Sequence, residues 1–286
     1  MKTFTTIVAF LSACAATSFA ADSSVKIAKT PFYPPHYNAR AHSGAKPRDD
    51  GDTVIVNAAS YQPGISPGGL ATIFGDNLAS VTGVLLADSD PLPAKFAGVE
   101  VFVSGYAAPI YGIAADADGQ DQISIQVPYE APTGPNAAEI QVVDESSGVT
   151  IADFFTDSFT EDPGIFVYNG LAIAQASDYS LITADNPAIP GETLILYATG
   201  LGPLNDPNLV DGYGSPTTPP FAETVDSYHV VLDNEDCNVY FSGLAPGYVG
   251  LYQINFEVPM DAASGNLQIY IQDAYANSAM TLLPVQ

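Results

Sequence analysis

The 286-residue chain is poor in the residues on which disulfides, nucleic-acid contacts and membrane spans depend. It has two cysteines, no tryptophan, and seven lysines and arginines against 32 aspartates and glutamates. Binding to phosphate groups needs clustered lysine and arginine, so this balance argues against nucleic acid and anionic membranes as partners. No segment approaches the run of ~20 apolar residues that a transmembrane helix needs, and we predict no transmembrane segment.

The N-terminus has the pattern of a secretory signal peptide over residues 1–20. Lys2 provides the positive charge, an apolar run covers residues 7–16, and Ser18-Phe19-Ala20 places small residues before the cleavage point. This pattern predicts a secreted, extracellular protein. An alternative interpretation is a lipid-anchored protein, because the residues at 11–14 (LSAC) resemble a lipobox in which Cys14 would be acylated.

Cleavage before Ala21 would leave Cys237 as the sole cysteine of the mature chain. An intrachain disulfide is then excluded, and a sandwich of ordinary size can bury enough apolar surface to fold without one. We interpret Cys237 as a small, half-buried packing residue. A free thiol that pairs with another molecule is the alternative.

The charges are divided unevenly along the chain. Residues 21–48 hold five basic residues and one acid, whereas from Asp49 onward 31 acids face one basic residue, Lys95. Residues 21–52 also contain four prolines and little apolar periodicity, so we predict a linker there. The acidic body can serve solubility, bind divalent cations, or receive the basic tail of a neighbouring copy, which would give self-association.

Short runs rich in valine, isoleucine, tyrosine and phenylalanine alternate with turn residues from Thr53 onward. Several runs alternate between apolar and polar residues, as in QINFEV at 253–258, and no segment of helical length has a 3.6-residue period. The pattern predicts an all-β protein. The expected strands cover residues 53–56, 70–74, 99–103, 123–127, 140–143, 193–197, 228–232, 239–241, 252–258, 267–271 and 280–285.

The chain also repeats itself. PGGLATIFGDNL at 67–78 matches PGETLILYATGL at 190–201, and QISIQVP at 122–128 matches QINFEVP at 253–259. A period this long predicts two homologous domains, which we place at 53–160 and 161–286 with the boundary near Glu161. We expect the Pro-Gly pairs to form tight turns before strands, and Gly75 and Gly200 to let the chain bend where strands end.

These motifs together resemble an uncharacterised family, the Solibacter-type C-terminal domain of secreted bacterial proteins. The resemblance covers residues 53–286, and its half-repeats are similar to IPT/TIG immunoglobulin-like modules. It implies two tandem immunoglobulin-like β-sandwich domains and supplies no catalytic residues. The motifs that carry it are VNAASY at 56–61, ISPG at 65–68, IFGDNLA at 73–79, VPYE at 127–130, PGIF at 163–166, YATGLGP at 197–203 and GLAPG at 243–247.

The sequence contains no recognisable catalytic motif. HExxH, GxSxG, P-loop and Cys/His metal patterns are all missing from it. His36 and His42 fall in the linker, and His229 is expected to be an exposed residue on a strand. We therefore predict a protein that is not an enzyme, with an enzyme of unrecognised type as the remaining alternative.

Three acidic loops are candidate calcium sites, and Ca²⁺ is the one cofactor we consider. In the first, Asp116, Asp118 and Asp121 alternate around Gly119, as in the first half of an EF-hand loop, but without its distal glutamate. A solvated acidic hairpin is the competing interpretation. The second loop contains Asp233, Asn234, Glu235 and Asp236, and the third contains Asp206, Asn208 and Asp211.

We predict a non-catalytic structural or adhesion module whose partner is a protein or polysaccharide at the cell surface or in the extracellular matrix. A calcium-dependent or carbohydrate-binding module is the alternative. Exposed tyrosines could provide a platform for sugar rings. The tyrosines least expected to be buried are Tyr33, Tyr37, Tyr106, Tyr111, Tyr248 and Tyr275.

Overall fold

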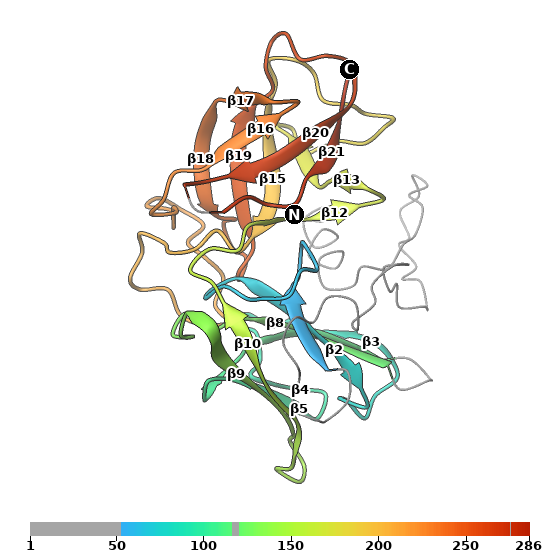
Figure 1. The fold of residues 1–286 in the computed structure, drawn as a ribbon, viewed down its shortest axis with the longest axis vertical. Helices are drawn as coiled ribbons and strands as arrows, with labels where there is room; N and C mark the ends of the chain where they lie inside the picture. The colour runs from blue at the N-terminus through green and yellow to red at the C-terminus, as the bar shows by residue number, and fades with distance from the viewer. Residues whose placement is uncertain (1–52, 116–119, 275) are drawn as a thin grey trace.

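A computed structural model describes residues 53–115, 120–274 and 276–286. These residues form strands, turns and loops and no helix, so within them no helix is available to cross a membrane. The strands build two immunoglobulin-like sandwiches that lie end to end along the long axis of the molecule (Figure 1). The predicted all-β fold class is confirmed.

The first sandwich packs two antiparallel sheets against each other. In one sheet the strands lie in the order β1-β2-β8-β7-β3, and in the other they lie in the order β10-β9-β5-β4, with β6 paired to β5. The strands are β1 (Val54–Asn57), β2 (Leu70–Asp76), β3 (Gly83–Leu86), β4 (Lys95–Phe96), β5 (Val99–Val103), β6 (Tyr106–Ala107), β7 (Ile110–Ala115), β8 (Gln120–Gln126), β9 (Gly134–Asp144) and β10 (Thr150–Ser158).

The second sandwich has one sheet in the order β11-β15-β19-β18, with β14 paired to β15, and another in the order β12-β13-β21-β20-β16-β17. The single parallel pairing among these named strands joins β13 to β21. The strands are β11 (Gly164–Ile165), β12 (Val167–Tyr168), β13 (Leu171–Ala172), β14 (Ala174–Ala176), β15 (Thr193–Thr199), β16 (His229–Leu232), β17 (Glu235–Cys237), β18 (Val239–Leu244), β19 (Tyr252–Glu257), β20 (Gly265–Gln272) and β21 (Thr281–Val285).

Alternating side chains fill the core of each sandwich. In β19 the residues Tyr252, Ile254 and Phe256 are buried while their neighbours are partly exposed, as the sequence alternation predicts. Cys237 is a buried free cysteine in the core of the second sandwich, so the interpretation as a packing residue holds. Burial raises the pKa of its thiol to about 12.

The two repeat copies have the same strand register. Leu70 faces Gln126 across β2 and β8, and the equivalent Thr193 faces Glu257 across β15 and β19. The turns that precede these strands are also equivalent, because Gly68 N donates to Val127 O at 2.9 Å and Gly191 N donates to Val258 O at 2.8 Å. The repeat in the sequence is therefore a repeat of backbone hydrogen bonds.

Every strand expected from the sequence is present, but two long strands were missed. All six residues of β7 are buried, and a short, uniformly apolar run has no period that marks it as a strand. β10 does alternate, since Ala152, Phe154 and Thr156 are buried and Phe155 is exposed between them. The expected boundary near Glu161 falls between the end of β10 and the start of β11.

Gly75 and Gly200, both expected to allow bends, differ in conformation. Gly200 has a φ of 74°, but Gly75 is not in the left-handed region, where the first copy instead places Asn77 with a φ of 54°. A Cβ atom on Gly75 would lie 2.7 Å from Thr53 Oγ1. Gly75 thus serves close packing, and the bend of the first copy occurs two residues later.

Candidate functional site

The first predicted calcium loop can be followed only in part. Asp116 and Asp118 lie outside the described residues, whereas Asp121 is 2% exposed. Its Oδ2 accepts a hydrogen bond of 2.7 Å from Ala79 N. A buried carboxylate that accepts a backbone N–H anchors the segment after β2 without any ion, so Asp121 has a structural role here.

The second predicted loop is an exposed hairpin. Asp233 and Asn234 form the turn between β16 and β17 with φ values of 50° and 71°. Glu235 and Asp236 follow each other in β17, so their side chains point to opposite faces of the sheet. Asp236 Oδ1 lies 3.7 Å from Nδ1 of His229, which is exposed on β16 as predicted.

The third acidic loop makes hydrogen bonds within the protein. Asp206 Oδ1 accepts from Asn208 N at 2.9 Å, which is an Asx turn. Asp211 Oδ1 accepts from Tyr129 N at 3.0 Å, so this side chain joins the second sandwich to the first. Across the described part of the chain, no group of three or more His, Cys, Asp or Glu side chains is arranged to hold a metal ion.

A third apolar cluster, which we call the junction, joins the two sandwiches. It is separate from the hydrophobic core of either sandwich and contains buried residues from both, among which Tyr197 is fully buried. The first sandwich contributes Ala58, Ala59, Leu70, Leu92 and Tyr111, and the second contributes Phe166, Ile173, Tyr197, Ala245, Val249 and Leu251.

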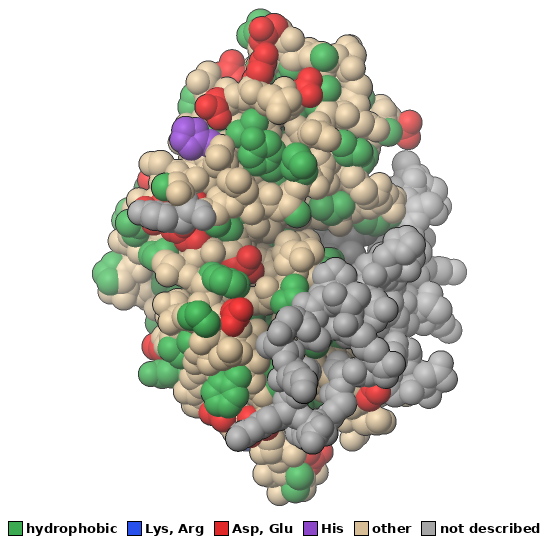
Figure 2. All heavy atoms as spheres, viewed as in Figure 1, with side chains coloured by type: hydrophobic (Ala, Val, Ile, Leu, Met, Phe, Trp, Pro, Cys, Tyr) green, Lys and Arg blue, Asp and Glu red, His purple; other side chains and the backbone are tan. Residues whose placement is uncertain are grey.

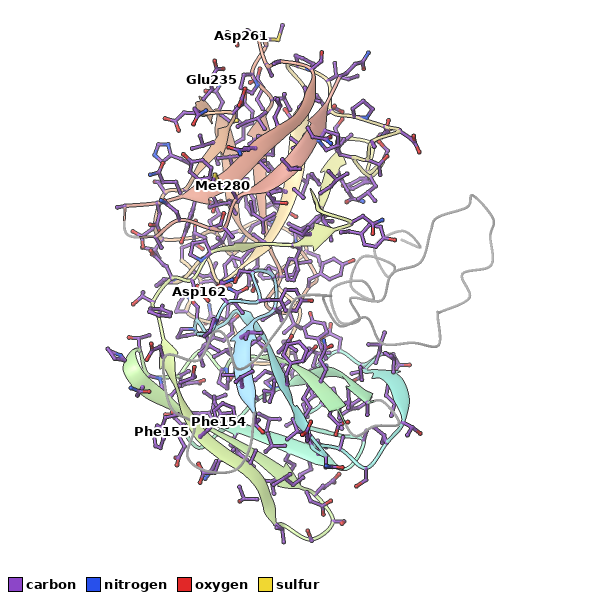
Figure 3. The ribbon with its side chains drawn as sticks, turned by 45° about the vertical axis from the view of Figure 1, so that its right-hand side comes forward. Phe154, Phe155, Asp162, Glu235, Asp261 and Met280 are labelled. Carbon is purple, nitrogen blue, oxygen red and sulfur yellow. The ribbon has the colours of Figure 1, made fainter. Side chains whose placement is uncertain are left out.

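Hydrogen bonds cross the junction beside this apolar cluster. Leu70 N donates to Thr199 Oγ1 at 2.7 Å, and the hydroxyl of Tyr111 donates to Val249 O at 2.6 Å. Asn57 Nδ2 donates to the backbone oxygen of Asp162 at 2.7 Å. Asp162 lies at the level where the two sandwiches meet (Figure 3). These buried polar groups are satisfied only while the sandwiches keep this relative position.

The segment between β15 and β16, residues 200–228, reaches across to the first sandwich. Leu92 N donates to Gly212 O, and Gly212 N donates to Gln126 Oε1, both at 2.7 Å. Burial raises the pKa of Asp211 in the same segment to about 6, and the carboxylate of Glu130 contributes in the same direction. Residues 200–228 therefore link the second sandwich to the first through these hydrogen bonds.

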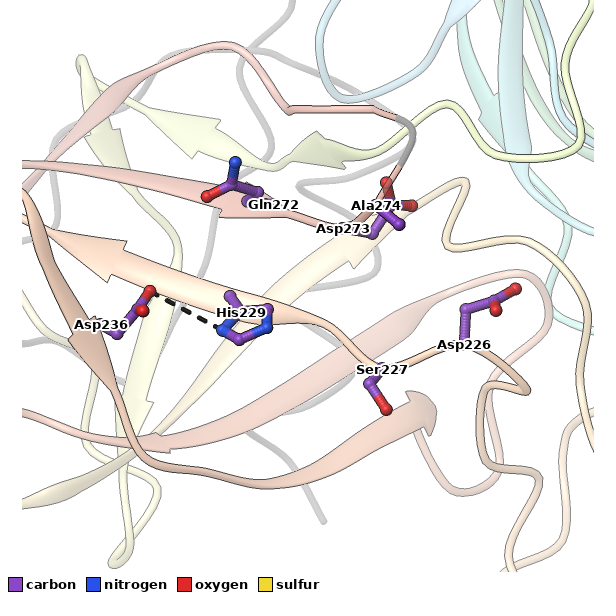
Figure 4. A pocket seen from close by; sticks show the side chains of 7 residues that line it. All are labelled: Asp226, Ser227, His229, Asp236, Gln272, Asp273 and Ala274. Atoms are coloured by element: carbon purple, nitrogen blue, oxygen red, sulfur yellow. Dashed lines mark ion pairs between the residues drawn. The ribbon is translucent and has the colours of Figure 1, made fainter.

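The described residues line two pockets. One has a volume of about 410 Å³ and lies between the sandwiches, where Pro67 and Tyr129 of the first face Pro203 and Leu204 of the second. The other, the acidic pocket, has a volume of about 480 Å³ (Figure 4). It is lined by Asp226, Ser227, His229, Asp236, Gln272, Asp273 and Ala274.

A buried glutamate adjoins the acidic pocket. Glu161 is 8% exposed and lies in the connection between the sandwiches. Burial, together with the neighbouring carboxyl groups of Asp273 and Asp226, raises the pKa of its carboxyl group to about 8. Acidic side chains are also spread over the visible surface of both sandwiches (Figure 2).

The tyrosines do not form the expected exposed set. Tyr111 is buried in the junction, which corrects its predicted exposure, because its ring packs between the two sandwiches. Tyr106 is exposed on β6 and Tyr248 is half-buried beside the junction. Tyr33, Tyr37 and Tyr275 lie outside the described residues.

Comparison with known proteins places the chain in no family. No protein-family profile matches it, and neither does any curated protein. Similar solved structures include domains 4–9 of the surface layer protein SbsC, with 13% identity and a TM-score of 0.21, over 81% of this chain and 31% of that one. The tandem Ig repeats of Dlar show 12% identity and a TM-score of 0.18, over 85% and 99% of the two chains.

An endo-fucoidan hydrolase of glycoside hydrolase family 107 is also similar, with 14% identity and a TM-score of 0.16, over 78% of this chain and 27% of the hydrolase. The chain thus spans less than a third of both the surface layer protein and the hydrolase. Structural similarity at this level carries no argument about function, so the functional proposal depends on the chain's own geometry.

Proposed function

We propose that the chain is a secreted, non-catalytic structural or adhesive module, which presents two immunoglobulin-like sandwiches as one rigid body at the cell surface or in the extracellular matrix. The observation that carries this proposal is the junction. Two domains in one chain move relative to each other by default, unless their interface is large and apolar. Here eleven buried residues, drawn from both sandwiches, form one apolar cluster.

The surface chemistry supports the same proposal. Acids outnumber basic residues 32 to seven in the whole chain, which favours solubility and disfavours phosphate-bearing partners. The partner is a protein or a polysaccharide. The signal-peptide pattern of residues 1–20 supports export, and the resemblance to the Solibacter-type family supports a role outside the cell.

Rigidity can be tested by small-angle X-ray scattering of the mature protein. The wild-type profile should fit one fixed arrangement of the two sandwiches. Leu251→Asp places a charge in the junction, where Leu251 is 1% exposed, and should give a longer, more variable particle. Tyr106→Ala, on the exposed β6, is the matched control. A wild-type profile that fits only a flexible ensemble would overturn the proposal.

The non-catalytic role can be tested on isolated cell-wall polysaccharide. Wild-type protein should sediment with the polysaccharide or with wall-associated protein, and should release no soluble oligosaccharides on long incubation. Release of such products by wild-type protein would show an enzyme instead. Failure of the protein to sediment with any surface fraction would remove the adhesive role.

Export can be tested by mass spectrometry after expression in a bacterial host. A secreted chain that begins at Ala21 supports the signal-peptide prediction. A membrane-bound chain that begins with an acylated Cys14 would establish the lipid-anchored alternative.

A further inference from the structure

The pocket between the two sandwiches, which we call the hollow, has the size of a ligand site. Its volume of about 410 Å³ lies within the range of roughly 300–1,000 Å³ found for binding pockets. Ala131 on one wall belongs to the core of the first sandwich, whereas Leu204 and Leu209 on the other wall pack against the core of the second. The packed cores therefore hold both walls in place before any ligand binds.

Tyr129 brings an aromatic ring to the hollow in a fixed position. Its backbone N donates to Asp211 Oδ1 at 3.0 Å, and its ring lies against Gly68, where a Cβ atom would be only 2.4 Å away. The residue is half-buried, so part of the ring stays accessible. A ring that is already fixed loses little conformational entropy when a flat ligand stacks on it.

Three polar side chains of the hollow have hydrogen-bonding capacity that the described part of the chain does not use. Thr133 and Thr160 are exposed, and their hydroxyls make no hydrogen bond within it. Asp206 accepts hydrogen bonds from Asn208 through Oδ1, which leaves Oδ2 available. The Asp206 carboxylate is also near enough to Tyr129 to help raise the pKa of its hydroxyl, although burial is the larger cause. The aromatic ring and an available acceptor therefore lie close together.

The charge of the lining restricts the class of ligand. No lysine, arginine or histidine lines the hollow, whereas Asp206 does. An anionic ligand would find no compensating charge there. A wholly apolar ligand would cover the polar groups of Thr133, Thr160 and Asp206 without offering them partners, which is costly. The lining suits a neutral ligand that has an apolar face and several hydroxyl groups.

We propose that the hollow binds a short stretch of a neutral polysaccharide. A sugar ring combines an apolar face, which stacks on Tyr129, with hydroxyl groups at its edge, which donate to Asp206 and exchange hydrogen bonds with the threonines. The inference rests on the proposed function, and it names the polysaccharide as the partner and the hollow as its site. Both sandwiches line the hollow, so the site exists only while the junction keeps them in place.

A peptide fits the hollow less well. Proline-rich peptides dock in grooves lined by several aromatic side chains, and Tyr129 is the one aromatic residue of this lining. Extended peptides add a strand to the edge of a sheet. All residues that line the hollow lie outside the named strands, so it offers no such edge.

The test is isothermal titration calorimetry of the mature protein. The neutral probes are cellotetraose, laminaritetraose, xylotetraose and mannotetraose, and tetragalacturonate is the acidic probe. At least one neutral oligosaccharide should bind. Tetragalacturonate should bind about tenfold more weakly or not at all, because its carboxylates meet Asp206 and no basic residue.

Variants of the lining locate the site. Tyr129→Ala should weaken binding about tenfold, whereas Tyr129→Phe keeps the ring and should change it by less than about threefold. Asp206→Asn keeps a side chain that can form the Asx turn, and should weaken neutral binding several-fold while reducing the preference over tetragalacturonate. Tyr106→Ala and Asp185→Asn change exposed residues outside the lining and should bind as the wild type does.

Thermal unfolding of each variant shows whether it is folded, and Asp206→Asn carries the test if Tyr129→Ala does not fold. Three results would overturn the proposal. They are no binding of any neutral oligosaccharide, equal binding of tetragalacturonate, and binding that neither Tyr129→Ala nor Asp206→Asn weakens. Tyr129-dependent binding of decaproline without sugar binding would assign the hollow to a protein partner.

Failure of this proposal and failure of the proposed function give different results. A rigid particle in X-ray scattering that binds no sugar would keep the structural module and remove only the saccharide site. A flexible wild-type particle would remove the rigid module itself. Leu251→Asp connects the two, since it should abolish sugar binding by displacing one wall of the hollow from the other.

Discussion

The same turn is buried in one repeat copy and partly exposed in the other. A Cβ atom on Gly68 would lie 2.4 Å from the ring of Tyr129, and one on Gly191 would lie 2.4 Å from Sδ of the equivalent Met260. Tyr129 lines the hollow between the sandwiches, whereas Met260 is 76% exposed at the other turn. Equivalent backbone hydrogen bonds therefore support two different surfaces.

The two residues after each glycine decide which surface forms. In the first copy they are Gly69 and Leu70, which are small and apolar and are buried against the second sandwich. In the second copy they are Glu192, which is half-buried, and Thr193, which is exposed. An apolar turn can dock on another domain, and a polar turn caps the end of its sandwich, as outer faces of terminal repeats do.

The largest expected loss of stability comes from a substitution in the apolar turn of the first copy. Leu70→Ala removes a side chain that is 7% exposed in the junction and should lower the free energy of unfolding by about 2–5 kcal/mol. The equivalent Thr193→Ala should change it by no more than about 0.5 kcal/mol. Urea denaturation measures both, and equal losses would contradict a docking role for the first turn.

A second prediction concerns the residue where each repeated strand turns away. Gly200 has a φ of 74°, and its Cβ atom would lie 2.1 Å from the backbone oxygen of Asp162. The equivalent Asn77 has a φ of 54° and is exposed. Gly200→Ala should therefore cost about 3 kcal/mol, which combines backbone strain with a clash, whereas Asn77→Ala should cost about 1 kcal/mol of strain alone.

Thermal and urea unfolding of the two alanine variants will sharpen the comparison. Gly200→Asn serves as the further control, because asparagine tolerates a positive φ and still carries the Cβ atom that clashes. If Gly200→Asn were as stable as the wild type, the close approach to Asp162 would not matter.

The third prediction concerns the connection between the sandwiches, where Glu161 should make the stability of the protein depend on pH. The pKa of Glu161 is about 8 in the folded protein against an ordinary value of 4.5, so between these values the folded state keeps a proton that the unfolded state has lost. Its stabilising contribution is complete below pH 4.5 and is lost as the pH rises through 8. The slope reaches at most about 1.4 kcal/mol per pH unit for one proton.

Glu161→Gln should flatten this part of the stability profile, since glutamine does not ionise, and the exposed Glu223→Gln should leave the profile unchanged. Denaturation at 0.5 M NaCl from pH 5 to 9 measures the effect under conditions that screen exposed charges. An identical slope in wild type and Glu161→Gln would contradict the assignment.

The smallest expected effect is on the reactivity of the Cys237 thiol and not on stability. Cys237 lies in the core of the second sandwich, and its thiol pKa of about 12 leaves almost no thiolate at pH 8. Alkylation should be negligible in the native protein and complete in denaturant. Leu70→Ala should speed alkylation only if breaking the junction also opens the second sandwich, so the thiol reports how far the two sandwiches depend on each other.

Local patterns in the sequence were enough to predict the all-β fold and to detect the repeat. Alternation in β19 marks one face as buried, and the turn glycines mark where strands begin. β7 was missed because its burial on every side leaves no period to detect. The alternation of β10 was a usable signal that went unused.

The acidic loops show where local patterns mislead. Asp121 and Asp211 were singled out because acids cluster near them in the sequence, yet both carboxylates accept backbone hydrogen bonds from distant segments. Glu161 was noted only as a boundary. Its carboxyl neighbours, Asp226 and Asp273, are far away in the chain, so no spacing rule could have brought the three together.

The sequence by itself determined most of the strands, the repeat and the division of charge, because these can be read from alternation, composition and matching motifs along the chain. Only the tertiary structure decided that the two sandwiches share an apolar junction, and that the acidic pocket forms between segments far apart in the chain. Burial and pairing are properties of contacts between distant residues. In the sequence, Gly69 and Leu70 indicate only the start of a strand. The tertiary structure shows that the second sandwich covers Leu70.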